Sequence, residues 1–336
     1  MRPPAPTSSG PDLPASVLLV RLGAIGDVTN ALLVAAALRR ARPDIRIGWA
    51  AHDLVLPLVE THPHIDAVHW WRRGSGLRGL RALAGELRSH EYALAVDLQR
   101  IAKSAALARL SGAPRVVGFD RARTKEASWL WTRERVAPDD PGKHMVEHYL
   151  DVVRHLGVDA PEVERVLPED PSAEAWAEAH VARGGAPLVV CLGASKAPNR
   201  WAPERFVTLV RGLRSDTGLP VALVGGPADR ALFASTLEAL GDAGVEDLVG
   251  RTNLLQLIAL LRRARAFVGC DTGPMHLAAA VETPVVALFG PADPRRTGPW
   301  GERHHVVRSP DGTMDGLSAE AVLETAVRVA TASAGS

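Results

Sequence analysis

The segment RLGAIGD brings two glycines and a carboxylate together directly after a short apolar run. Gly23 and Gly26 would let the backbone pass close to a ligand, and Asp27 could then take a proton from an attacking hydroxyl group. The spacing is G-x-x-G, so the dinucleotide-binding fingerprint G-x-G-x-x-G is absent. A helix N-cap is the alternative role for Asp27, because aspartate often accepts a hydrogen bond from a backbone N–H two or three residues further on. Local sequence leaves both interpretations open.

The segment DTGPMH has the composition of a strand end followed by a helix start. Asp271 closes an apolar run, and Thr272 and Gly273 leave backbone N–H groups bare. Pro274 suits a first helical turn, and His276 would lie within that turn. Free N–H groups at the positive end of a helix dipole form a favourable seat for phosphate. A simple capped helix with a surface histidine is the alternative.

The segment GASKAPNRW offers one hydroxyl and two cations in a loop before a helix start. Ser195, Lys196 and Arg200 could bind a diphosphate, since charge-assisted hydrogen bonds to phosphate are strong. The P-loop spacing is absent. Ala197 occupies the position where the esterase motif G-x-S-x-G requires its last glycine. An ordinary basic loop is the alternative.

Two further groups of residues carry weaker signals. The segment HMVEH matches one metalloprotease order, with His144 and His148 on one helix face, yet no third ligand follows, so a polar helix face is favoured and no metal is expected. Tryptophans and basic residues gather in the first half, where they could bind an anionic sugar or a lipid headgroup, or form scattered solvated charge. These residues are Trp70, Trp71, Trp129, Trp131, Arg72, Arg73, Arg121, Arg123 and Lys125.

Short apolar runs alternate with longer segments of helical period along the chain. Strands are expected at 16–20, 45–50, 67–70, 92–96, 115–118, 187–192, 221–224, 247–249, 266–270 and 285–289. Helices are expected at 30–42, 77–87, 144–156, 203–216, 229–240, 254–263, 274–281 and 318–330. This alternation predicts an α/β protein with parallel sheets covered by helices on both faces. The chemistry-bearing segments all follow strands, where ligands bind in open parallel sheets.

Domain organisation follows from length and composition. A chain of 336 residues with 46% hydrophobic residues can fill two cores. Prolines and acidic residues between 156 and 174 suit a linker. We therefore expect a disordered Pro/Ser-rich tail over 1–15, an N-terminal Rossmann-like domain over 16–165, and a C-terminal Rossmann-like domain over 166–336. The two are expected to face each other across a cleft.

Charge and cysteine content exclude several classes of protein. The formal net charge is +1, from 39 basic and 38 acidic residues, which argues against a nucleic-acid-binding protein. Cys191 and Cys270 each lie in an apolar run, so they are expected to be buried thiols in a reducing compartment. Neither a targeting segment nor an apolar stretch of about 18 residues is visible, which predicts a soluble protein.

The motifs in combination resemble glycosyltransferase family 9, the ADP-heptose:lipopolysaccharide heptosyltransferases. The resemblance covers about residues 16–301 and rests on four segments in the family's order. It implies the GT-B architecture of two Rossmann-like domains, inversion at the sugar carbon, and catalysis without a metal or other cofactor. The segments that carry it are VRLGAIGDVTNALLVAAALRRARP, YALAVDLQRIAKSAALARLSGAPRVVGFD, LGASKAPNRWAPERF and DTGPMHLAAAVETPVVALFGPADPRRTGPWG.

The resemblance also implies a role for individual residues. It makes Asp27 the general base, with Gly23 and Gly26 in the acceptor loop. It places Asp271, Thr272, Gly273 and His276 around the diphosphate and sugar of the donor, and Ser195 with a nearby cation on the diphosphate. Many members carry Lys-Arg-Trp or Lys-His-Trp where this chain has Asn199-Arg200-Trp201. Either Lys196 or Arg200 could therefore supply the cation.

The expected function is transfer of heptose, or a related sugar, from an ADP-sugar donor to a lipopolysaccharide core acceptor. The second domain would hold the donor and the first the acceptor. We expect a cytoplasmic enzyme with peripheral contact to the inner membrane and no nucleic-acid partner. A nucleotide-sugar epimerase or hydrolase of the same architecture is the enzymatic alternative. A nucleotide-sugar-binding protein without transfer activity is the other alternative, and the presence of Asp27 together with the complete 271–276 motif counts against it.

Overall fold

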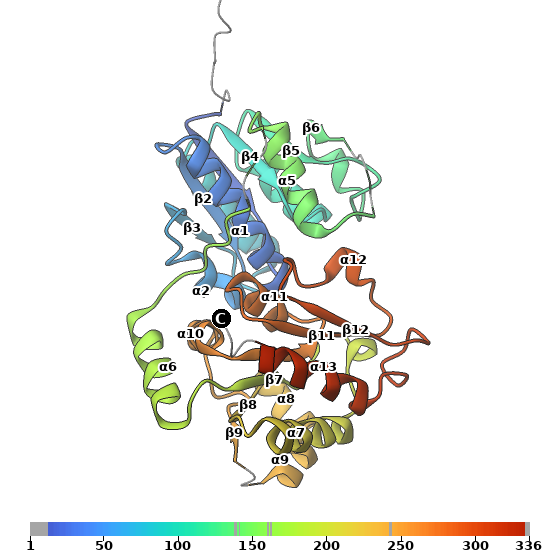
Figure 1. Ribbon diagram of the computed structural model, residues 1–336. Coiled ribbons are helices and arrows are strands. Elements are labelled where there is room, and N and C mark those ends of the chain that lie inside the picture. Colours follow the sequence, from blue (N-terminus) through green and yellow to red (C-terminus); the bar gives the residue numbers. More distant parts are fainter. Residues whose placement is uncertain are drawn as a thin grey trace, which may run out of the picture. The chain divides into compact units, whose positions relative to one another are not determined.

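The computed structural model describes residues 13–137, 140, 142–159, 161, 163–241 and 244–332. Most of the expected N-terminal tail lies outside these residues. The chain divides into two compact units. The first consists of residues 1–23, 31–141 and 146–166, and the second of residues 24–30, 142–145 and 167–336. The two units are described separately below (Figure 1).

The first unit is built on a parallel sheet with the strand order β3-β2-β1-β4-β5-β6 among the described residues. Every neighbouring pair runs parallel, and Val17 at its centre pairs with Ile47 on one side and Leu94 on the other. The strands are β1 (Ser16–Val20), β2 (Arg46–Ala51), β3 (Ala67–Trp70), β4 (Leu94–Asp97), β5 (Arg115–Phe119) and β6 (Glu134–Val136). The accompanying helices are α1 (Ile25–Ala41), α2 (Leu56–Val59), α3 (Gly76–Ser89), α4 (Ala102–Leu110) and α5 (Met145–His155), with 3-10 turns η1 (Asp53–Val55) and η2 (Ser128–Leu130). The first residues of α1, up to Asn30, and Met145 of α5 belong to the second unit.

The second unit repeats this plan with the strand order β12-β11-β10-β7-β8-β9 in its described part. Its strands are β7 (Leu188–Cys191), β8 (Val221–Val224), β9 (Val245–Asp247), β10 (Ala266–Cys270), β11 (Val285–Phe289) and β12 (His305–Arg308). Its helices are α6 (Pro171–Gly184), α7 (Pro203–Thr217), α8 (Pro227–Leu232), α9 (Ala234–Leu240), α10 (Leu254–Arg263), α11 (Gly273–Ala280), α12 (Pro294–Thr297) and α13 (Ala319–Ala332), with the 3-10 turn η3 (Ala197–Asn199).

Both sheets are wound in two directions from their centre. In the second unit the crossover from β7 to β8 runs toward one edge, and the crossover from β10 to β11 runs toward the other. Because such crossovers are right-handed, their helices cover opposite faces of the sheet. Helices α7 and α13 share one core with alternate strand residues, and α6 packs with α10 in a smaller cluster. The expected α/β class with two parallel sheets is confirmed, and the loops after β7 and β10 lie where such a sheet binds ligands.

Helix α1 begins five residues earlier than its apolar period predicts. It starts at Ile25, so Asp27 lies inside the first helical turn rather than before it. An N-cap residue stands before the first turn, so the capping role considered for Asp27 does not apply. The carboxylate instead occupies the end of the helix where negative charge is stabilised. No helix in the described part of the chain is both long and apolar enough to cross a membrane.

Several elements differ from the sequence expectations. The strands β6 and β12 were not expected, because their sequences ERV and HVVR are short and polar. The helical segment expected at 229–240 is divided at Phe233 into α8 and α9. The proline-rich segment taken as a linker already contains the start of α6, where the side chain of Asp170 caps the helix by accepting a hydrogen bond from the backbone N–H of Ala173 (2.8 Å).

The two cysteines are central to the second sheet. Cys191 ends β7 and Cys270 ends the neighbouring strand β10, and both are free and buried. Burial raises the pKa of each thiol to about 12, because the thiolate has no access to solvent there. The expectation of two buried core thiols is confirmed, and neither is a reactive nucleophile at neutral pH.

Candidate active site

Two helix N-termini meet in the second unit. Gly26 in the first turn of α1 lies against the ring of His276, where an added Cβ would be 2.3 Å from Cδ2. Gly273, the first residue of α11, lies against Ile25, where an added Cβ would be 2.7 Å from the Ile25 Cβ. Glycine is required at both positions for this approach. The positive ends of two helix dipoles are therefore brought to one place.

His276 is held in a defined orientation within this site. It is buried, and its Nδ1 accepts a hydrogen bond from the side-chain amide of Asn30 (3.2 Å). Burial lowers the pKa of His276 to about 4, against the charge of Asp27, which raises it, while His144 lowers it further. The imidazole is therefore neutral at physiological pH. With Nδ1 accepting, the proton is on Nε2, which lies 3.8 Å from a carboxylate oxygen of Asp271.

Asp271 follows β10 directly, at the carboxyl end of a central strand. Its Oδ2 accepts a hydrogen bond from the Thr297 hydroxyl at the end of α12 (3.2 Å). Burial raises the pKa of the Asp271 carboxyl, and the negative charge of Asp27 adds to this. The Thr297 hydrogen bond and the charge of Lys196 act in the opposite direction. The charges of both Asp27 and Lys196 therefore affect the pKa of the Asp271 carboxyl.

Asp27, Asp271 and His276 are therefore brought together, although 244 residues separate Asp27 from Asp271. Asp27 is half-buried, so it is neither enclosed in the core nor fully in solvent. Its neighbour Gly26 contacts the His276 ring directly. A carboxylate, a neutral imidazole and two helix N-termini form a site that can remove a proton and bind an anion in the same place.

The loop after β7 presents the remaining predicted donor-binding residues. Ser195 and Lys196 are exposed, and Lys196 acts electrostatically on Asp271. Arg200 is exposed too, but its Nε donates a hydrogen bond to the carbonyl oxygen of Ala194 (3.0 Å), which turns part of the guanidinium back onto its own loop. Of the two cations, Lys196 is the one whose charge reaches the Asp271 carboxylate.

Three residues of this site were not selected from sequence. Asn30 and Thr297 hold the His276 ring and the Asp271 carboxylate. His144 lies near His276, with its Nε2 3.0 Å from the carbonyl oxygen of Gly298. Only Asn30 had a usable signal, because it follows Asp27 by three residues and shares its helix face.

The two histidines of HMVEH do not form a metal site. His148 is buried, with its Nδ1 3.3 Å from a guanidinium nitrogen of Arg123. His144 instead contacts Gly298 and the Trp300 ring. The preference for a non-metal role is therefore supported by separate surroundings for the two rings.

The basic and aromatic residues of the first unit divide into two kinds. Arg123 is buried and pairs with Asp120 and Asp151 at 3.0 and 2.9 Å, so it is part of the framework. Trp70 is 42% exposed, and the guanidinium of Arg72 lies 4.3 Å from its ring centroid. Of these two kinds of residue, the exposed ones, such as Trp70 and Arg72, are available to contact an anionic group.

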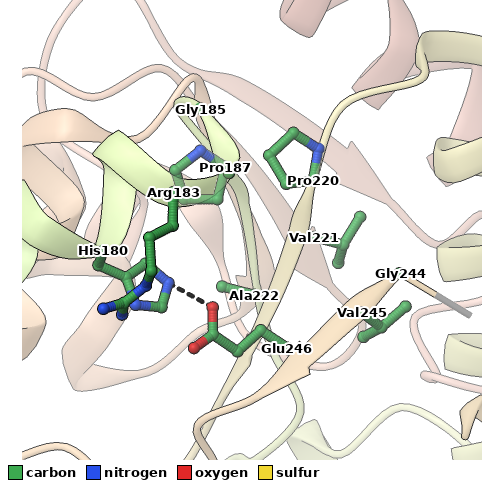
Figure 2. A pocket seen from close by; sticks show the side chains of 11 residues that line it. His180, Arg183, Gly185, Pro187, Pro220, Val221, Ala222, Gly244, Val245 and Glu246 are labelled. Atoms are coloured by element: carbon green, nitrogen blue, oxygen red, sulfur yellow. Dashed lines mark ion pairs between the residues drawn. The ribbon is translucent and has the colours of Figure 1, made fainter. Parts of the chain in front are cut away.

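A separate pocket of about 310 Å³ lies at the opposite edge of the second sheet. Pro187 and Pro220, which precede β7 and β8, line it, so it is at the amino ends of the strands. Figure 2 shows the ion pair of His180 and Glu246 at its side, with the His180 Nε2 and a Glu246 carboxylate oxygen 2.5 Å apart. It contains none of the predicted site residues.

Comparisons of this chain with a family model, with protein sequences and with solved structures all point to one family. The family model for glycosyltransferase family 9 (heptosyltransferase) matches residues 80–326. Lipopolysaccharide heptosyltransferase 1 of Pseudomonas aeruginosa is 31% identical over 297 residues, which cover 85% of this chain and 81% of that protein. The solved glycosyl transferase family 9 protein of Veillonella parvula has a TM-score of 0.83 at 20% identity and covers 95% of this chain and 97% of its own. The E. coli ADP-heptose lps heptosyltransferase II structure has a TM-score of 0.80 at 23% identity, with coverages of 94% and 99%.

Proposed function

The chain belongs to glycosyltransferase family 9, the heptosyltransferase family, and from this premise we propose that it transfers heptose from an ADP-sugar to a lipopolysaccharide core acceptor. The donor proposal is supported by the E. coli structural relative, whose name includes ADP-heptose. The acceptor proposal is supported by the lipopolysaccharide heptosyltransferase relatives. Family membership favours transfer over epimerisation, hydrolysis or binding alone. We further place the enzyme in the cytoplasm, in peripheral contact with the inner membrane that carries its acceptor.

Asp27 acts as the general base in this proposal. Its carboxylate takes the proton from the acceptor hydroxyl as that oxygen attacks the anomeric carbon of the donor. The bond between this carbon and the diphosphate oxygen breaks, and its electron pair leaves with ADP. Attack from the face opposite the leaving group inverts the configuration at the carbon. The half-exposed position of Asp27 is suited to this role, because the acceptor can reach the carboxylate.

A neutral His276 keeps this base available. A protonated imidazole beside Asp27 would pair with the carboxylate and make it a weaker base. Burial holds the His276 pKa at about 4, so the ring carries no charge at neutral pH. The hydrogen bond from Asn30 to Nδ1 leaves the proton on Nε2, where it can be donated to an oxygen of the donor.

The leaving diphosphate is stabilised without a metal in this proposal. Backbone N–H groups at Thr272 and Gly273 and the positive end of α11 face the developing charge, and Ser195 and Lys196 add a hydroxyl and a cation. Asp271 accepts hydrogen bonds from sugar hydroxyls while Thr297 holds its second oxygen. The Lys196 ammonium supplies the charge that other members draw from a lysine before the tryptophan.

One observation carries the proposal: the first turn of α1, with its carboxylate, lies against the first turn of α11 in one compact unit. The packing of Gly26 on His276 brings a base to the anion-binding end of another helix. General-base removal typically costs about 100-fold or more in rate. We therefore expect Asp27→Asn to fold normally and to lose about 100-fold or more in kcat.

The test is a mass-spectrometric transfer assay with several nucleotide sugars and truncated lipopolysaccharide cores. Asp216→Asn, at an exposed position of α7, is the matched control and should retain full activity. NMR of the product gives the anomeric configuration. An Asp27→Asn variant within threefold of the parent enzyme, or a product with retained configuration, would contradict the mechanism. Release of sugar or formation of an epimer from donor alone would instead support the hydrolase or epimerase alternative.

A further inference from the structure

A cluster of two histidines and one glutamate lies in the first unit, outside the candidate active site. His69 is on the edge strand β3 and is 1% exposed. Glu86 lies in the last turns of α3, and His90 follows the end of that helix. Each offers one ligand atom, and these atoms all lie within 4.8 Å of one another. In the part of the chain that the structure describes, no other three residues of metal-ligating type come this close.

The chemistry of this set matches a transition-metal site. Two imidazole nitrogens and one carboxylate oxygen are ligands that Zn²⁺ accepts, at bond lengths of about 2.0–2.2 Å. Tetrahedral ligands at that range lie about 3.4 Å apart. The His69 Nδ1 and a Glu86 carboxylate oxygen are 2.6 Å apart, and the His69 and His90 rings meet edge to face with centroids 4.6 Å apart. Small rotations of Glu86 and His90 would bring all three atoms to a common ion.

The second nitrogen of His69 already has the partner that a metal-binding histidine needs. Its Nε2 is 2.7 Å from the Tyr92 hydroxyl. The Tyr92 ring also stacks on His90, with an interplanar angle of 5°. Tyr92 fits because residue 48 is glycine, where an added Cβ would be 1.9 Å from the Tyr92 hydroxyl oxygen. Outer partners of this kind fix the ring orientation of ligating histidines.

The His69 ring can present a nitrogen to an ion by changing its hydrogen-bonding pattern. In the structure its Nδ1 lies 2.6 Å from a Glu86 carboxylate oxygen and its Nε2 lies 2.7 Å from the Tyr92 hydroxyl, so Nδ1 donates to Glu86 and Nε2 accepts from Tyr92. When the proton moves to Nε2, Tyr92 becomes the acceptor and Nδ1 is free to bind an ion.

Access to the cluster is from the side of Glu86. The Glu86 side chain is 49% exposed and lines a pocket of about 210 Å³ together with Trp71 and Arg72, which follow β3, and with other residues of α3. Arg46 covers the Tyr92 ring at 4.9 Å and donates a hydrogen bond to the carbonyl oxygen of His90. Arg46 opposes a cation electrostatically, while the Glu86 carboxylate favours one.

We propose that His69, Glu86 and His90 bind one Zn²⁺ ion, with Tyr92 as the outer partner of His69. The fourth position faces the pocket and takes water. Because His69 is on the sheet edge and the other two ligands are at the end of α3, the ion ties that helix to the edge strand. The site stabilises the first unit and takes no part in sugar transfer.

The test is a Zn²⁺ titration of the full-length, tag-free protein against a chromophoric chelator, with metal content measured by mass spectrometry. We expect one Zn²⁺ per chain at this site. Glu86→Gln and His90→Gln should each weaken binding at least about 10- to 100-fold, and Tyr92→Phe should weaken it within that range. Glu86→Gln keeps an oxygen that can accept from His69, so the fold is preserved. Glu91→Gln and His305→Gln, both exposed, are the matched controls and should bind as the parent does.

Two further measurements separate metal binding from a purely structural hydrogen bond. Co²⁺ should give the visible absorption of a tetrahedral site in the parent and lose it in Glu86→Gln and His90→Gln. A chelator should lower the Tm of the parent protein and leave the Tm of those two variants unchanged. Equal Zn²⁺ affinity in parent and variants, or no binding by the parent at 100 µM, would overturn the proposal.

Discussion

Replacing Gly26 by alanine is the most direct test of the contact between α1 and α11. An added Cβ would lie 2.3 Å from the Cδ2 of His276, whereas ordinary contact begins at 3.4 Å, so the helix start or the ring must move by about 1.1 Å. A misplacement of about 1 Å in a catalytic group can cost about 100-fold in rate, or about 2.7 kcal/mol. We therefore expect Gly26→Ala to lower kcat about 100-fold.

The same substitution is favourable elsewhere in a helix, which gives a matched control. Gly85 is an exposed residue of α3 with nothing within 4 Å of an added Cβ. Gly85→Ala should therefore stabilise the protein by about 0.5–1 kcal/mol, as helix propensity predicts, with unchanged kcat. Unfolding in urea would show whether Gly26→Ala remains folded.

A double-mutant cycle identifies the cause of the loss. In a His276→Ala background the ring that the new methyl group meets is absent, so Gly26→Ala should cost less than about threefold there. The assay is steady-state transfer with saturating donor and acceptor. A Gly26→Ala enzyme within threefold of the parent kcat, or an equal loss in both backgrounds, would refute the argument that this packing positions Asp27.

Three further outcomes are expected. Thr297→Val removes the hydrogen bond that lowers the Asp271 pKa, so the acid limb of the kcat/KM profile should move to higher pH, and kcat/KM at pH 7 should fall about 10-fold. Lys196→Gln should raise the donor KM at least about 10-fold, and Arg200→Gln should raise it less; the reverse order would assign the cation to Arg200. Burial lowers the pKa of His62 from 6.5 to about 4, so as pH falls the unfolded chain binds this proton before the folded chain does. The free energy of unfolding should therefore fall by up to about 3 kcal/mol between about pH 6.5 and pH 4 because of His62. Urea unfolding across that pH range should show that the free energy of unfolding falls less in His62→Gln than in the parent. Parallel plots of unfolding free energy against pH would argue against the lowered His62 pKa.

The central strands could be predicted from the sequence because they are buried on both faces. The bounds of β1, β8, β10 and β11 are those that their apolar runs indicate. The edge strand β3 could be predicted as well, because its sequence AVHW is apolar apart from His69. The edge strands β6 and β12 escaped prediction because residues such as Arg135 and His305 face solvent and leave no apolar signal. Hydrophobic pattern reports burial, so it reports the middle of a sheet better than its edge.

The start of α1 shows a different limit. Ile25, Gly26 and Asp27 carry no period that distinguishes a helix from a loop, and the glycine lowers helix propensity. Their helical conformation goes together with packing against α11, a contact between segments about 246 residues apart. Such long-range packing can override local preference, and sequence reasoning has no access to it.

The candidate site was only partly accessible for the same reason. Asp27, Asp271 and His276 each follow a strand, so the position of strand ends was enough to select them. Thr297 comes from a segment without such a mark, and the sequence suggested His144 only as a metal ligand, so the contacts alone assign both residues to this site. The His69 cluster likewise joins a strand to the far end of the next helix, at spacings that match no known ligand motif.

The two buried thiols have a practical consequence for experiments in solution. Cys191 and Cys270 have pKa values of about 12, so alkylating reagents at neutral pH find almost no thiolate on the native protein. A cysteine introduced on an exposed surface would then be the single reactive handle, without prior removal of the native pair. With two introduced cysteines, one on each compact unit, fluorescent or spin labels would report the distance between the two labelled positions during turnover.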